Sequence, residues 1–128
     1  MLAIRAAVAL PDPVEAVHAV IAAVVEHWER QGHILLTLKA VSELDPGAIA
    51  PVDEQRQDQR NSIEHVVHGL DREDRLNGLT RAQVVAALHL VTSVESFMEL
   101  RRNAGLSLAA TKKVLTAMAV GLVDLDPR

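Results

Sequence analysis

Apolar residues recur at helical spacing along most of the chain, which predicts helices rather than strands. Asp12 can cap a helix and Pro13 suits its first turn. The next apolar positions then mark one buried face, which is formed by Val14, Val17, Val20, Ile21, Val24, Val25 and Trp28. We expect Gly32 to end this helix, a second helix to span residues 34–44, and the Asp-Pro-Gly sequence at 45–47 to stop it.

The second half of the chain continues the pattern with three further helices. Residues 51–70 carry mixed charges on one side and apolar residues on the other, as in an amphipathic surface helix. Thr80 and Gln83 have the spacing of a capping box, so we expect a long helix over residues 80–102. A last helix is expected over residues 107–123. The prediction is an all-α bundle of about five to six helices that ends in a helical hairpin.

The two hairpin helices are apolar on nearly every side. A helix that packs on one core needs a single apolar stripe, whereas a helix that is apolar all round must be covered all round. We therefore expect a homodimer in which the two hairpins form a four-helix bundle. The residues expected at this interface are Val84, Leu88, Val91, Met98, Val114, Leu115, Met118 and Leu122.

Composition supports a helical fold and narrows the possible partners. The chain has 128 residues, which suits one domain over residues 1–128, and 49% of them are hydrophobic but only 2% aromatic. There is no cysteine, so disulfides and thiolate metal sites are excluded. The net charge is −4, and nucleic acid would need a basic face. The apolar residues 1–10 are too few to span a bilayer, so we expect a cytoplasmic protein without membrane contact.

The connection between the hairpin helices is the most informative stretch. Residues 93–107 read SVESFMELRRNAGLS. Arg101 and Arg102 suit the negative C-terminal end of a helix, and Gly105 can adopt the positive φ that ends one. Ser107 can then cap the next helix.

Two upstream segments add to this motif. Residues 28–32 read WERQG, an aromatic-Glu-x-x-Gly junction. A later predicted helix then contains Arg56, Gln59, Ser62 and Ile63. Taken in order, the three segments resemble the C-terminal ligand-binding and dimerisation domain of the TetR family of transcriptional regulators. The resemblance covers the chain from about residue 12 onward. Many members of the family carry Arg, His, an aromatic and a β-branched residue at these four spacings, so Gln59 and Ser62 depart from the family pattern.

The resemblance implies that the hairpin forms a dimer and that the middle helices enclose a small, largely apolar effector. A small residue at Ser62, where an aromatic is common, leaves room for an apolar ligand or for neighbours that collapse inward. The residues expected around this effector are Trp28, Leu36, Ala40, Ser62, Val66, His89, Thr92 and Phe97. Effector binding would shift the dimer between two geometries and so control DNA binding, most simply as a repressor.

The family's N-terminal DNA-reading domain has no counterpart in this sequence. We therefore expect either a fragment of a regulator or a stand-alone relative. In either case, DNA would be contacted only through a domain that is not present in this chain.

Two other functions remain open at this stage. A ligand-free dimerisation module would be favoured if side chains fill the core and if hydroxyls such as Ser62 and Thr92 bond back to their own helix. A metal-dependent enzyme would be favoured if His65, His68 and His89 converge. No hydrolase, P-loop or dinucleotide motif is present. No catalytic residue, metal or cofactor is therefore expected.

Overall fold

The computed structural model describes residues 2–127, apart from the side chains at positions 2 and 48. All regular structure in this part of the chain is helical, which confirms the all-α prediction. The elements in chain order are α1 (Leu2–Val8), α2 (Pro13–Ser42), the 3-10 helix η1 (Pro46–Ala48), α3 (Ile49–Arg72), α4 (Arg81–Val91), α5 (Val94–Met98), the π-helical turn η2 (Glu99–Asn103) and α6 (Leu108–Leu122). No helix within these residues is long and apolar enough to cross a lipid bilayer.

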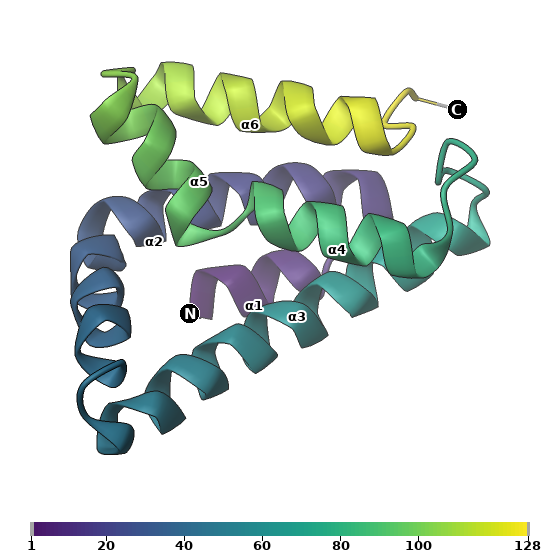
Figure 1. Ribbon diagram of the computed structural model, residues 1–128. Helices are drawn as coiled ribbons and strands as arrows, with labels where there is room; N and C mark the ends of the chain where they lie inside the picture. The colour runs from purple at the N-terminus through teal and green to yellow at the C-terminus, as the bar shows by residue number, and fades with distance from the viewer. Residues whose placement is uncertain (1, 128) are drawn as a thin grey trace.

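The helices pack as a small bundle around α2 and α4. Figure 1 shows α6 along the top of the molecule, α4 and the first half of α2 below it, and α3 running diagonally beneath. The short α1 packs against both α2 and α3. The largest fully buried apolar side chains come from five helices and from the residue after α6, and they form one core: Ile21, Val25, Val67, Leu70, Val84, Phe97, Leu115 and Val123.

Three predicted helix starts are confirmed by their caps. The Asp12 carboxylate accepts from the backbone N–H of Val14 at 2.9 Å, and Pro13 occupies the first turn of α2. Thr80 and Gln83 form the reciprocal capping box of α4. Ser107 caps α6. These signals involve only residues within one turn of each other, so they are readable from sequence.

The two helices predicted over residues 12–44 are a single helix, and Gly32 does not end it. Gly32 is buried inside α2, where a Cβ atom would lie 2.6 Å from Met98 Cε and 3.2 Å from Val94 Cγ2. The glycine therefore permits the close approach of α5 rather than a helix stop. Figure 1 shows the second half of α2 turning away from the first half and running down the left edge of the molecule.

The long helix predicted over residues 80–102 is broken between α4 and α5. Thr92 has a ψ of 5° and Ser93 a ψ of 155°, so the chain leaves the helix at this point. The N–H of Ser96 bonds to the Ser93 hydroxyl at 3.1 Å instead of to the Thr92 carbonyl. That carbonyl accepts two other donors, Trp28 Nε1 at 2.9 Å and Gln59 Nε2 at 3.0 Å. Side chains from α2 and α3 thus satisfy the backbone group that the break exposes.

Packing within the chain limits which hairpin residues can face a partner. Four of the eight residues predicted at the dimer interface lie in the chain's own core, because α4 packs against α3 and α6, and α6 also packs against α2: Val84, Leu88, Val91 and Leu115. Met98, Val114 and Leu122 are half-buried. The large apolar side chains that stay exposed on α4 and α6 are Leu90 (61%), Met118 (43%) and Val120 (50%).

A buried arginine fastens the C-terminal segment to the loop between α3 and α4. Arg75 Nε donates to Glu73 Oε1 at 2.9 Å, and its Nη1 donates to the carbonyls of Asp124 and Asp126 at 3.0 and 2.8 Å. Arg75→Ala should lower the free energy of unfolding by about 1–3 kcal/mol, the usual cost of unpairing buried polar groups. Urea denaturation followed by circular dichroism measures this change. A variant as stable as the wild type would show that the hydrogen bonds of Arg75 do not contribute to the stability of the fold.

Candidate ligand cleft

An open cleft of about 430 Å³ lies between the second half of α2, α3, α4 and the start of α5. This volume lies within the range of about 300–1,000 Å³ that is usual for small-molecule sites. Fifteen side chains from these four helices line it: Leu35, Lys39, Val52, Gln55, Arg56, Gln57, Gln59, Arg60, Val85, Ala86, His89, Leu90, Ser93, Val94 and Glu95.

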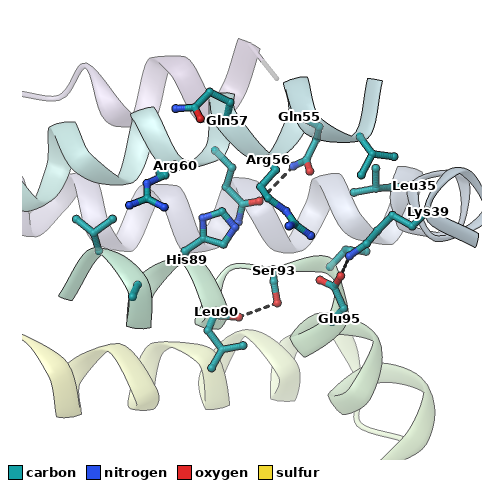
Figure 2. Close-up of a pocket in the computed structure, with 15 residues that line it drawn as sticks. Leu35, Lys39, Gln55, Arg56, Gln57, Arg60, His89, Leu90, Ser93 and Glu95 are labelled. Carbon is teal, nitrogen blue, oxygen red and sulfur yellow. Dashed lines mark hydrogen bonds and ion pairs between the residues drawn. The ribbon is translucent and has the colours of Figure 1, made fainter. Parts of the chain in front are cut away.

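Cationic side chains of α2 and α3 and the imidazole of His89 on α4 line this cleft. Arg56 and Arg60 are one turn apart on α3 and so project from the same side of that helix. His89 of α4 lies between them in the view of Figure 2, and Lys39 of α2 lies at the far edge beside Glu95 of α5.

Only part of this positive charge is neutralised within the chain. Lys39 forms an ion pair with Glu95, and Arg60 Nε lies 3.2 Å from Glu64 Oε1 in an exposed pair. No described carboxylate forms an ion pair with Arg56.

Burial and, to a smaller extent, neighbouring cations lower two pKa values in the cleft. Partial burial lowers the pKa of His89, and the nearby positive charges of Arg56, Arg60 and Lys39 lower it further. Partial burial and the Arg56 guanidinium likewise lower the pKa of Lys39. The cleft therefore disfavours additional positive charge, and a bound anion would relieve this repulsion.

The base of the cleft is apolar. Leu35, Val52, Val85 and Val94 line it and are buried. Gln59 is also buried, but its amide nitrogen already donates within the chain. Nε2 donates to the Thr92 hydroxyl at 2.9 Å as well as to the Thr92 carbonyl. The lining of the cleft therefore combines charged side chains with buried apolar side chains at its base.

The structure does not bring the eight predicted ligand residues together. Only His89 lines the cleft. Ser62, Val66 and Thr92 border a separate apolar void of about 20 Å³, which has room for little more than one water. Trp28 and Phe97 border an open depression of about 270 Å³ beside Arg101 and Arg102. Leu36 and Ala40 line none of these three spaces.

The space beside Ser62 is thus too small for an effector molecule. Several hydroxyls also bond to nearby backbone carbonyls, as the alternative interpretation predicted. Ser62 Oγ donates to the Asp58 carbonyl at 3.1 Å, and Thr92 Oγ1 donates to the Leu88 carbonyl at 2.8 Å. Thr37 Oγ1 bonds to the His33 carbonyl at 2.8 Å. An enclosed apolar pocket is therefore not formed around these residues.

The three histidines considered as metal ligands are also dispersed. His65 and His68 border a shallow surface depression near the end of α1, whereas His89 lies in the cleft. Among residues 2–127, no three His, Asp or Glu side chains gather closely enough to hold a metal ion.

Comparison with family models, with curated proteins and with solved structures finds no match to this chain. The resemblance to the TetR family therefore stays a prediction that rests on the residues described above.

Proposed function

We propose that this chain is the effector-binding and dimerisation domain of a TetR-like transcriptional regulator, most simply a repressor. We also propose that its effector occupies the cleft between α2, α3, α4 and α5. The observation that carries this proposal is the position of the cleft across the break in the hairpin. Its lining includes His89 and Leu90 before the break, and Ser93 and Glu95 after it.

A ligand in this position would touch both segments of the first hairpin arm. The helix is interrupted between them, and we propose that the angle between α4 and α5 differs between two states of the domain. A ligand shifts such an equilibrium only by the difference between its affinities for the two states. Contacts to both α4 and α5 provide a basis for such a difference, which the hairpin would pass on to a second copy of the chain.

The dimer is proposed to form on the exposed apolar side of the hairpin. Leu90 of α4 and Met118 of α6 supply large exposed apolar side chains to this surface. Val120 is two residues from Met118 and so lies on another side of α6, where it shares a surface with Lys112 and Lys113. A stable interface would bury about 1,200–2,000 Å² in total. A second copy of the chain is the proposed partner, and DNA would be contacted only through another domain.

A dimerisation module without a ligand is the second candidate. The observation that favours it is the closely packed core, in which the void beside Ser62 has a volume of only about 20 Å³. The two candidates differ in whether the open cleft binds anything.

A thermal-shift screen of small molecules separates these candidates when it compares the wild type with a variant whose cleft is filled by a large side chain. A compound present at about 100 times its Kd adds roughly 2.7 kcal/mol to the stability of the folded state, which raises the Tm by several degrees. Ala86→Trp should abolish this rise, because Ala86 is exposed and lines the cleft. Ala82→Trp is the matched control, one turn earlier on α4 and outside the lining.

Stabilisation of the wild type and the Ala82→Trp variant, but not of Ala86→Trp, is the result expected. If no compound in a chemically broad screen stabilises the wild type, the ligand-free module is the better account. Equal stabilisation of the Ala86→Trp variant would place the ligand elsewhere.

A further inference from the structure

We propose that the cleft is specific for an organic anion, namely a carboxylate carried on an apolar body. This inference rests on the proposed function, since it takes the cleft to be the effector site. The carboxylate would lie against Arg56, Arg60 and His89, and the apolar body against Leu35, Val52 and Val85. The ligand chemistry thus differs from the largely apolar effector expected from sequence.

The distribution of charge supports an anion. The chain as a whole is acidic, with 17 Asp and Glu residues against 13 Lys and Arg residues. The cleft has the opposite balance, because its lining contains Lys39, Arg56 and Arg60 but only one carboxylate, Glu95. Arg56 and Arg60 are exposed to solvent. Cations grouped in a cleft with apolar walls raise the local concentration of anions.

The arginine side chains determine which anions fit. A guanidinium presents N–H donors in a planar fork that matches a carboxylate or a phosphate. Arg56 has no ion-pair partner among the described residues, so a ligand anion would not have to displace a carboxylate from it. Arg60 would have to exchange only its exposed pair with Glu64, and exposed pairs contribute little to stability.

The apolar base of the cleft distinguishes an amphipathic anion from a free inorganic one. Leu35, Val52, Val85 and Val94 offer no hydrogen bonds from their side chains, so inorganic phosphate would leave this area unfilled. A carboxylate with an aliphatic chain removes the same area from water, at roughly 0.8 kcal/mol for each buried CH₂ group.

Calorimetric titration of the full chain with three probes tests this inference. Octanoate supplies both features, octan-1-ol lacks the charge, and inorganic phosphate lacks the apolar body. We expect octanoate to bind about tenfold or more tightly than octan-1-ol, since charge-assisted hydrogen bonds are the stronger kind. Phosphate should show no measurable binding. NMR titration of His89 should also show its pKa rising when octanoate binds, because the anion offsets the surrounding positive charge.

Charge variants provide the matched controls. Arg56→Gln should weaken octanoate binding by about tenfold or more and leave octan-1-ol binding unchanged. Arg72→Gln, an exposed arginine on the same helix but outside the lining, should bind octanoate like the wild type. Glu95→Gln should strengthen octanoate binding, because it removes the one carboxylate in the lining. Should Arg56→Gln fail to fold, Arg60→Gln gives the same comparison.

The outcomes separate this inference from the function on which it rests. Equal affinity for octanoate and octan-1-ol would overturn the inference, as would octanoate binding that Arg56→Gln leaves intact. If neutral compounds stabilise the wild type but not Ala86→Trp, while octanoate does not bind, the effector cleft stands and the anion specificity is wrong. If no compound of any class binds in the cleft, the proposed function itself fails.

Discussion

Trp28→Ala should remove about 3–5 kcal/mol from the free energy of unfolding, the range for truncating a large buried aromatic. Trp28 is 2% exposed, and its indole N–H donates to the carbonyl of Thr92 at the break between α4 and α5. A domain of this kind is stable by only about 5–15 kcal/mol, so the loss is a large fraction of the total. Guanidinium denaturation followed by far-UV circular dichroism measures it without depending on tryptophan emission.

Trp28→Phe separates the packing of the ring from its hydrogen bond. Phenylalanine keeps much of the apolar area but leaves the Thr92 carbonyl with Gln59 as its one remaining side-chain donor. We expect the free energy of unfolding of Trp28→Phe to lie between the values for the wild type and Trp28→Ala. If the free energy of unfolding of Trp28→Ala lies within about 1 kcal/mol of the wild-type value, Trp28 does not stabilise the break between α4 and α5.

Met118→Asp, combined with Leu90→Asp, should convert the proposed dimer into a folded monomer. Both side chains are exposed in the single chain, so the aspartates carry little penalty there. In a dimer interface they would bury uncompensated charge, which costs several kcal/mol. Sedimentation equilibrium at micromolar concentration should show the mass falling from two chains to one.

Leu44→Asp provides the matched control for this experiment. Leu44 is 89% exposed in the turn after α2, away from α4 and α6, so its variant should keep the dimer mass. Leu115→Asp is not a suitable test, because Leu115 lies in the chain's own core and its variant should unfold. A wild-type protein that sediments as a monomer would contradict the proposed dimer.

The sequence predicted those parts of the fold that depend on neighbouring residues. Helical periodicity and the caps at Asp12, Thr80 and Ser107 act within a turn, and all three caps are present. Gly105 has a φ of 71°, as expected for the residue that follows the first hairpin arm.

The features that were missed depend on contacts between distant segments. Gly32 lies within a helix because α5 packs against it, and the break after Val91 is stabilised by Trp28 and Gln59, which are far away in sequence. The apolar character of α4 on all sides suggested a partner chain, but α3 and α6 of the same chain cover most of it.

The cleft was missed for a similar reason. Arg56 and Arg60 belong to a segment of mixed charge, which is typical of a solvated helix face. Nothing in their spacing indicates that Lys39 and His89 lie opposite them, because those residues come from two other helices. The predicted ligand residues rest on the family resemblance instead. Four of the eight are buried: Trp28, Val66, Thr92 and Phe97.

The most direct test of the proposed function is to locate the ligand on the wild-type protein by NMR. The protein would be titrated with a compound that stabilises it, and the backbone amide shifts would be mapped onto the fold. We expect the largest changes in amide shift at cleft residues such as Arg56, His89 and Glu95. These changes should be lost in the Ala86→Trp variant. Changes centred instead on Ser62 and Val66, with the amides of the cleft unaffected, would contradict it.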